Sequence, residues 1–282
     1  MTYLIHGATG AQGAPVAAAL SRSGHHVTAA VRNTAAYTAG PAVAVDTADL
    51  DSLVDAYTGA DGVFVHLPLG SPAQQLEQAT TIATAVDRAR PGRVVFSTSG
   101  YTLGGDNDED DSAHGVLVRR LEASGVPTAV IAPRLYLENL LLPPVITATR
   151  EEGILPYPIR EDFLVSWSSH LDIAEVALRL FEDPSVTGVV TVGALPGLSG
   201  PDLAKAFSNH FGREVRFHAQ TPDEFGEMII PIFGADGIAP VVDSYRWRAT
   251  LDDELIDETR SAQALLGLAP RSVEHWLRDI GA

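Results

Sequence analysis

The feature that most constrains the fold is a glycine-rich segment, His6-Gly7-Ala8-Thr9-Gly10-Ala11-Gln12-Gly13. It follows a short apolar run and precedes an alanine-rich helical stretch, and its glycines have the spacing G-x-x-G-x-x-G. In such a strand–loop–helix unit the first glycine permits a tight turn, the second lets the backbone approach a pyrophosphate, and the third allows close helix–strand packing. The free N–H groups at the helix N-terminus then bind the phosphates. We therefore predict a dinucleotide site, with a ligand-free glycine turn as the alternative.

Strand-like and helical patterns alternate through the first half of the chain, which is typical of βαβ units and a parallel sheet. The predicted strands are Tyr3–His6, Val27–Val31, Ala42–Val45, Gly62–His66, Arg93–Ser97 and Thr128–Ala132. The predicted helices are Gln12–Ser23, Asp49–Tyr57, Ala73–Ala89 and Ala113–Ser124. Gly24 and Gly125 follow two of these helices, where a left-handed residue is expected.

After Pro133 the pattern becomes mainly helical. We predict helices at Leu171–Phe181, Gly200–Phe211 and Pro222–Phe233, and strands at Val189–Val192 and Glu214–Phe217. The predicted fold class is α/β, a Rossmann doubly wound parallel sheet with a smaller, mostly helical C-terminal substrate part. We place the Rossmann domain at residues 1–150, with core strands to about residue 132, and the substrate part, which is not an independent domain, at 151–282.

Composition excludes several classes of function. The net charge of −17 would repel a phosphate backbone, so we expect no nucleic-acid partner. The absence of cysteine excludes disulfides, thiol catalysis and thiolate metal sites. No apolar run is long enough to span a bilayer, and the N-terminus lacks a basic segment followed by an apolar stretch. We therefore expect a cytoplasmic protein that does not bind a membrane.

An acidic run, Asp106-Asn107-Asp108-Glu109-Asp110-Asp111, lies after the fifth predicted strand. It lacks the spaced ligands and the central glycine of a calcium loop. We therefore predict a solvated loop and no metal. Its position leaves open whether it closes over the site as a lid.

The end of the second strand, Val31-Arg32-Asn33-Thr34, indicates which cofactor is preferred. An acidic residue there would bind the ribose 2′-hydroxyl of NADH, whereas a guanidinium suits a 2′-phosphate. We therefore predict NADPH, with NADH as the alternative and a merely solvated Arg32 left open. Asp46 and Thr47 are expected near the adenine, and the His66-Leu67-Pro68 turn after the fourth strand is expected along the ribose and nicotinamide. The full set of predicted cofactor contacts is Gly7, Thr9, Gly10, Ala11, Gln12, Gly13, Arg32, Asn33, Asp46, Thr47, Leu67, Pro68 and Ser97.

Together these residues resemble the NmrA-like branch of the atypical short-chain dehydrogenase/reductases, and the resemblance covers nearly the whole chain. It rests on an ordered set of segments: Gly7–Gly13, Val31-Arg32-Asn33, Asp46 with Asp49-Leu50, Val94–Ser99, His114, Ser124-Gly125-Val126-Pro127, Glu138-Asn139, Asp172-Ile173-Ala174, and Leu265-Leu266-Gly267 with Ala269-Pro270-Arg271. The resemblance implies a Rossmann core, a smaller C-terminal substrate part and a cleft between them.

The chain departs from the branch near the expected substrate cleft. The cation that often follows the sixth strand is shifted to Arg134, and Val118 stands where the branch often has lysine. The usual short-chain dehydrogenase reduces a carbonyl with a tyrosine assisted by a lysine four residues later. Lys205 is the sole lysine and Pro201 lies four residues before it, so this pair does not exist here.

Other side chains remain as candidates for catalysis. Thr98 and Ser99 follow the fifth strand, where α/β sheets place ligands, and either hydroxyl is a candidate to polarise a carbonyl. Tyr101 and His114 are candidate proton donors. Local capping or a surface position is the alternative for each. The predicted substrate contacts, for which a core position is the alternative, are Tyr136, Asn139 and Trp167.

Two functions remain open. The first is an NADPH-dependent reductase of a ketone or quinone on a polycyclic aromatic small molecule, whose own hydroxyl supplies the proton. The resemblance fits ketoreductases that tailor aromatic polyketides in antibiotic biosynthesis, including angucyclinone-type ones. The second is a non-catalytic NADP(H) sensor that acts on a protein partner, which the resemblance also allows. The oligomeric state is left open.

Overall fold

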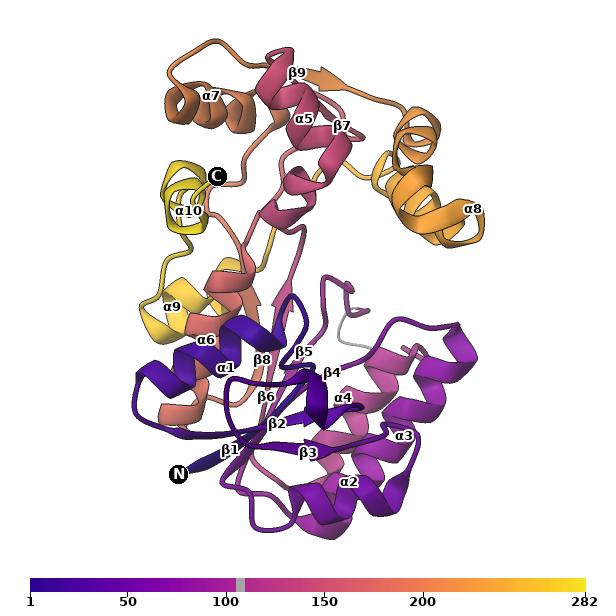
Figure 1. Cartoon of the computed structure of the whole chain (residues 1–282), viewed down its shortest axis with the longest axis vertical. Helices are drawn as coiled ribbons and strands as arrows, with labels where there is room; N and C mark the ends of the chain where they lie inside the picture. The colour runs from indigo at the N-terminus through magenta and orange to yellow at the C-terminus, as the bar shows by residue number, and fades with distance from the viewer. Residues whose placement is uncertain (105–109) are drawn as a thin grey trace. The chain divides into compact units, whose positions relative to one another are not determined.

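The computed structural model describes residues 1–104 and 110–282, with side chains at 235 and 236 excepted. The acidic run at 106–111, for which a solvated loop was predicted and a lid was left open, therefore lies mostly outside the described residues. The chain forms two compact units (Figure 1): unit 1 comprises Met1–Pro133, His170–Val192 and Glu258–Leu268, and unit 2 comprises Arg134–Ser169, Gly193–Asp257 and Ala269–Ala282. The division is discontinuous, whereas the sequence prediction used one boundary at residue 150.

Unit 1 is built on a seven-stranded sheet with the order β3-β2-β1-β4-β5-β6-β8, in which every pairing is parallel. This confirms the predicted Rossmann fold class. Its elements are β1 (Thr2–His6), α1 (Gly13–Arg22), β2 (His26–Val31), η1 (Thr34–Ala36), β3 (Ala42–Ala44), α2 (Leu50–Tyr57), β4 (Gly62–His66), α3 (Pro72–Ala89), β5 (Val94–Ser97), α4 (Ala113–Ser124), β6 (Thr128–Pro133), α6 (His170–Glu182), β8 (Gly188–Val192), η3 (Glu258–Arg260) and α9 (Ala262–Leu266).

The sheet reverses its winding between β1 and β4, because β2 and β3 extend to one side of β1 and the later strands to the other. Open α/β sheets bind ligands at this switch point, outside the carboxyl ends of the strands. The glycine-rich loop follows β1 and His66 ends β4, so both lie at this point.

Local sequence signals set the helix ends in unit 1. The α3 helix begins with a capping box between Ser71 and Gln74, followed by a proline in its first turn. The Ser112 hydroxyl caps α4 by accepting from the N–H of Gly115. Gly24 and Gly125 have φ of 82° and 70°, as predicted for the residues that end α1 and α4.

Helices cover both faces of the sheet (Figure 1). The α3 helix packs against both α2 and α4, and α1 packs against α6. The apolar face of the first group forms a core with the strands that contains the fully buried Leu53, Ile82 and Leu117. This rigid layer fixes the carboxyl edge of the sheet, where the site lies.

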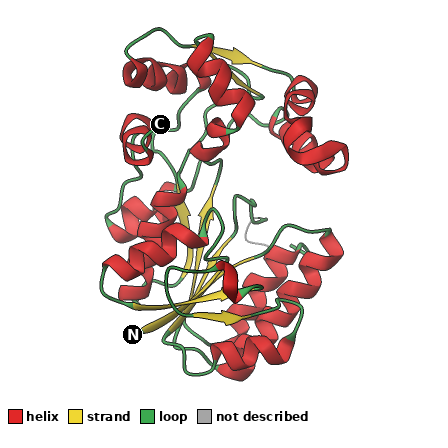
Figure 2. Cartoon of the chain, viewed as in Figure 1, coloured by secondary structure: helices red, strands yellow, loops and turns green. Residues whose placement is uncertain are grey.

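Unit 2 is largely helical in its described part (Figure 2). Its elements are η2 (Leu137–Leu141), α5 (Pro143–Glu151), β7 (Ile154–Tyr157), α7 (Gly200–Phe211), β9 (Arg216–Ala219), α8 (Pro222–Arg248) and α10 (Val273–Ile280). The β7 and β9 strands form a parallel pair. The α8 helix is kinked at Gly234, where φ is 72° and ψ is 162°, so the predicted end at Phe233 marks the kink.

Among residues 1–104 and 110–282, no helix combines the length and apolar character that a membrane crossing requires.

Candidate functional site

A cavity of about 560 Å³ lies within unit 1 and includes the switch point of the sheet. It is lined by His6, Gly7, Thr9, Gly10, Ala30, Val31, Arg32, Val45, Asp46, Thr47, His66, Pro68, Leu69, Gln74 and Gln78. Seven of the predicted cofactor contacts are in this lining: Gly7, Thr9, Gly10, Arg32, Asp46, Thr47 and Pro68. The other six, Ala11, Gln12, Gly13, Asn33, Leu67 and Ser97, are not, and their roles stay predictions.

The glycine-rich loop forms a cradle that side chains would fill. Gly7 has φ of 60°, and the N–H of Gly10 donates to the carbonyl of Gly7 at 2.7 Å. A Cβ atom at Gly13 would lie 2.3 Å from the Gly7 oxygen and 2.4 Å from the His6 oxygen. Because both neighbours are backbone atoms, only glycine allows α1 to begin so close to the loop. The cradle therefore fits a pyrophosphate at the helix N-terminus.

Arg32 is exposed at the end of β2 and lines the cavity. Within residues 1–104 and 110–282, no hydrogen bond or ion pair engages its guanidinium. The neighbouring Asn33 caps η1, since its Oδ1 accepts from the N–H of Ala35 at 3.1 Å. Arg32 is therefore available for a ligand phosphate, whereas the side-chain oxygen of Asn33 already accepts the hydrogen bond that caps η1.

Gln78 of α3 is a lining residue that the sequence analysis missed. Its Oε1 is buried and has no hydrogen-bond partner among the described residues. A buried acceptor without a partner costs about 1–3 kcal/mol, so this oxygen is suited to a ligand N–H donor. The exocyclic amino group of adenine is such a donor, and glutamine amides pair with adenine edges.

We expect Gln78→Leu to raise the Kd for NADPH about five- to tenfold, since a net hydrogen bond contributes about 1 kcal/mol. Isothermal titration with NADPH measures the change. Thr80→Ala, at an exposed position of α3 that is not part of the cavity lining, is the matched control and should leave the Kd unchanged. An unchanged Kd for Gln78→Leu would contradict the assignment.

Two histidines also line the cavity: His6, which is buried and was not predicted as a contact, and His66, which is half-buried and belongs to the predicted turn after the fourth strand. His66 lies over the loop, with its Nε2 2.4 Å from where a Cβ of Gly7 would stand. The His6 Nε2 lies 3.0 Å from the Tyr57 hydroxyl. Burial lowers the pKa of His6 to about 3, and burial also lowers the pKa of His66. Both imidazoles are therefore neutral at neutral pH and offer hydrogen bonds rather than positive charge.

These neutral histidines predict a loss of stability in mild acid. The unfolded chain binds a proton at each histidine below about pH 6.5, whereas folded His6 does so only near pH 3 and His114 near pH 4. The contribution of these histidines to the free energy of unfolding is therefore fully present above about pH 6.5. Each group then removes up to about 1.4 kcal/mol of unfolding free energy per pH unit as the pH falls further.

Urea unfolding between pH 7.5 and 5.5 measures this dependence, because carboxyls stay largely ionised in both the folded and the unfolded chain over this range. We expect His6→Gln to flatten the pH profile. A wild-type unfolding free energy that is constant over this range would show that the histidines are not buried in the neutral form.

The chain turns sharply after β5. Ser99 has φ of 56°, the left-handed region that favours glycine. Its N–H donates to the Ser97 Oγ at 3.3 Å, and its Oγ accepts from the Gln12 Nε2 at 2.9 Å. Thr98 is fully buried, and its Oγ1 has no partner in the described part of the chain. Ser99 is therefore the more accessible of the two candidate hydroxyls.

Tyr101 and His114 are brought together. Their rings stack with centroids 4.4 Å apart and an interplanar angle of 2°. Burial lowers the pKa of His114 to about 4, against the opposing effect of the Asp110 carboxylate. His114 is therefore neutral at pH 7, and as an imidazole it is a weak proton donor.

The predicted substrate contacts belong to unit 2, whereas Ser99, Tyr101 and His114 belong to unit 1. Tyr136 is buried next to η2, and its backbone bridges to Ser168. Trp167 is almost fully buried and packs edge-on against the Tyr157 ring. Burial raises the pKa of the Tyr157 hydroxyl, and the Asn139 side chain opposes this with a smaller lowering effect. Trp167 thus has a core position, and a substrate role for these three residues stays a prediction.

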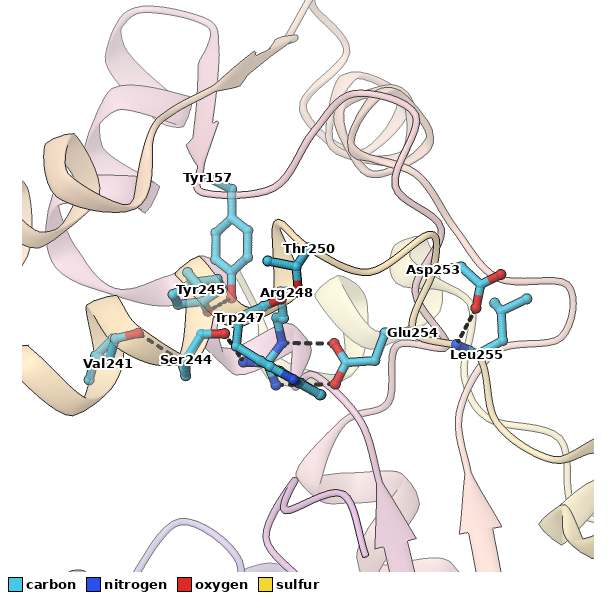
Figure 3. Close-up of polar contacts among 10 residues, drawn as sticks. All are labelled: Tyr157, Val241, Ser244, Tyr245, Trp247, Arg248, Thr250, Asp253, Glu254 and Leu255. Atoms are coloured by element: carbon cyan, nitrogen blue, oxygen red, sulfur yellow. Dashed lines mark hydrogen bonds and ion pairs between the residues drawn. The ribbon is translucent and has the colours of Figure 1, made fainter. Parts of the chain in front are cut away.

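Figure 3 shows the polar cluster at the end of α8 in unit 2. Arg248 donates to both carboxylate oxygens of Glu254, at 2.7 and 3.2 Å, and both side chains are buried. The Tyr157 and Tyr245 hydroxyls are hydrogen-bonded to each other beside this pair. Burial raises the pKa of Tyr157 well above its usual value. The cluster joins the end of α8 both to the segment that follows it and to β7, and its paired charges indicate a structural role.

Comparison with known proteins shows which family the chain belongs to. The sequence profile of the NmrA-like family matches residues 1–277. The chain belongs to the NmrA-like family. Similar solved structures are the Citrobacter sp. triphenylmethane reductase complexed with NADP(H) (TM-score 0.80, 16% identity, 99% of each chain) and the Escherichia coli NADPH-dependent quinone oxidoreductase complexed with NADPH (0.73, 18%, 100% of each chain). A Staphylococcus aureus nucleoside-diphosphate-sugar epimerase is also similar (0.76, 19%, 99% of this chain and 100% of the other). These likenesses show that this NmrA-like chain shares their fold.

Proposed function

We propose that the chain is an NADPH-dependent oxidoreductase that reduces a ketone or quinone carbonyl on a polycyclic aromatic small molecule. The observation that carries the cofactor assignment is Arg32, which lines the cavity of the glycine cradle without an ion-pair partner among the described residues. A guanidinium at this place favours a 2′-phosphate. NADP(H) in the similar triphenylmethane reductase and NADPH in the similar quinone oxidoreductase support the same assignment.

NADPH supplies a hydride to the carbonyl carbon when it is bound. The chain's own part is to hold the carbonyl and stabilise its oxygen, for which the accessible Ser99 hydroxyl is the candidate donor. The exposed Tyr101 ring, stacked on His114, offers a flat aromatic surface two residues further on. This surface supports an aromatic substrate.

The proton must come from a group other than an assisted tyrosine. The only lysine is Lys205, in α7 of unit 2. The residue four positions before it is Pro201, so it cannot assist a tyrosine in the usual way. His114 is neutral at pH 7 because its pKa is lowered. A hydroxyl on the substrate beside its ketone would supply the proton to the carbonyl oxygen and regain one from water.

We expect the methyl ether of such a hydroxyketone to lose about a hundredfold or more in kcat, since a positioned general acid contributes about 10²–10⁴. Tyr101→Phe and His114→Ala should keep kcat with the free hydroxyketone within about tenfold, because neither is the proton source. Steady-state NADPH oxidation measures all three. This proton source would be contradicted if the wild type reduced the methyl ether at the full rate and the Tyr101→Phe or His114→Ala variant did not reduce the free hydroxyketone.

The activity itself is tested by following NADPH oxidation with a panel of polycyclic aromatic ketones and quinones, with NADH alongside. Turnover with NADPH would support the reductase. Tight NADPH binding without turnover across the panel would instead favour an NADP(H) sensor with a protein partner.

A further inference from the structure

We propose that Gln12 is a positioning residue, which holds the Ser99 hydroxyl with its hydrogen free for the substrate carbonyl. The inference rests on the proposed function and assigns Gln12 a role that the glycine motif does not: its side chain serves the catalytic turn after β5 rather than the phosphates.

The observation is a closed set of hydrogen bonds between the loop after β1 and the end of β5. The Ser97 Oγ donates to the Gln12 Oε1 at 2.8 Å, and the Gln12 Nε2 donates to the Ser99 Oγ at 2.9 Å. The N–H of Ser99 donates back to the Ser97 Oγ at 3.3 Å. Both ends of the Gln12 amide are thus occupied by residues of the β5 turn.

Donor and acceptor counting fixes the direction of these bonds. Ser97 is fully buried and its oxygen accepts from the Ser99 N–H, so its own hydrogen needs an acceptor, which is the Gln12 Oε1. The Gln12 amide must then present its NH₂ group to Ser99. The opposite orientation would leave the buried Ser97 hydrogen without an acceptor, at a cost of about 1–3 kcal/mol.

This direction leaves the Ser99 hydrogen available. The Ser99 oxygen accepts from Gln12, and in the described part of the chain its hydroxyl donates to no other group. It is therefore preset as a donor to a carbonyl oxygen that becomes negative during hydride transfer, an arrangement that needs little reorganisation.

The backbone supports the same conclusion. Ser99 adopts φ of 56°, which costs a residue with a side chain about 1–2 kcal/mol that glycine would avoid. Gly100 follows with φ of 88°. This turn carries the Ser99 hydroxyl back towards Gln12, so the strain coincides with the hydrogen bond that orients the hydroxyl.

Two Gln12 variants test the role on a substrate that the wild type reduces. Gln12→Glu keeps the acceptor for Ser97 but accepts from Ser99, which turns the Ser99 hydrogen inwards. Gln12→Met keeps the size without hydrogen bonds or charge. We expect kcat to fall about ten- to a hundredfold in both, a smaller loss than that of an oxyanion donor itself. For Gln12→Met, the Kd for NADPH should stay within about twofold.

Coupling to Ser99 separates this role from a structural one. In a Ser99→Ala background, Gln12→Met should lower kcat no further, because its only effect passes through the missing hydroxyl. Multiplicative losses of kcat would overturn the proposal. So would a Gln12→Met enzyme with normal kcat and a tenfold higher Kd for NADPH, which would make Gln12 a cofactor ligand.

A second readout is independent of turnover. In protein labelled with ¹⁵N at glutamine side chains, the Gln12 amide signal, identified by its loss in Gln12→Met, should exchange slowly with water and shift strongly in Ser99→Ala. A Gln12 signal that exchanges rapidly or is unaffected by Ser99→Ala would overturn the proposal, even if no substrate is found. Wild-type protein that turns over no substrate while this signal behaves as expected would count against the proposed function alone.

Discussion

Replacement of Gly13 by valine is expected to raise the Kd for NADPH by about a hundredfold or more, equivalent to about 2.8 kcal/mol. The reason is steric, since a Cβ at this residue would stand 2.3 Å from the Gly7 oxygen and 2.4 Å from the His6 oxygen. These backbone atoms cannot move without displacing α1 from the loop. The N–H groups of the helix N-terminus would then no longer face the pyrophosphate.

Isothermal titration with NADPH measures this loss, and circular dichroism checks that the variant is folded. Gly40→Ala is the matched control, because its new Cβ would meet nothing closer than a Tyr37 ring atom at 4.0 Å. If Gly13→Val does not fold, Gly10→Val offers a second test. Its Cβ would lie 3.2 Å from the Gly7 oxygen, and its side chain would enter the cavity. Unchanged affinity in a folded glycine variant would show that the cradle does not bind the phosphates.

Replacement of Arg32 by glutamate should reverse the preference between the two nicotinamide cofactors. A hydrogen bond to a charged group contributes about 1.5–3 kcal/mol, so we expect the Kd for NADPH to rise about tenfold to a hundredfold from this loss alone, with repulsion of the 2′-phosphate added. Glutamate can instead accept from the ribose 2′-hydroxyl of NADH. The Kd for NADH should therefore stay constant or fall.

The control for charge is Arg22→Glu, at the exposed end of α1, which changes the net charge of the chain equally. It should leave the ratio of the two Kd values unchanged. Arg32→Glu protein that still prefers NADPH to the wild-type extent would mean that another residue recognises the 2′-phosphate.

Sequence patterns predicted the strands and the longer helices of unit 1, because each of these has a local signal, whereas the short η1, η3 and α9 were not predicted. The β5 strand is recognised as an apolar run. The α4 helix lies between Ser112 and Gly125, so its two ends follow from a capping residue and a left-handed glycine. The short β7 strand was missed, since its four residues contain Pro156 and its partner β9 lies far along the chain. Periodicity could not show that α8 continues past the kink at Gly234.

The site, like the fold, contains residues that a local sequence pattern predicted and residues that no pattern indicated. The cradle and Arg32 were predicted because fixed spacing after a strand indicates their position. The Gln12–Ser97–Ser99 hydrogen bonds join residues more than eighty positions apart, and no sequence pattern indicates that an amide will meet these hydroxyls. Gln78 carried no signal either, since its importance lies in a buried oxygen without a partner.

The most direct test of the central claim is transfer of deuterium from C4 of labelled NADPH to the carbonyl carbon of an aromatic ketone, followed by mass spectrometry of the alcohol. The account predicts one deuterium per product molecule with the wild type, and loss of the reaction in folded Gly13→Val or Gly10→Val protein. A product that carries no label, or labelled product formed equally well by those variants, would contradict the claim that the cradle of unit 1 holds a nicotinamide cofactor for reduction.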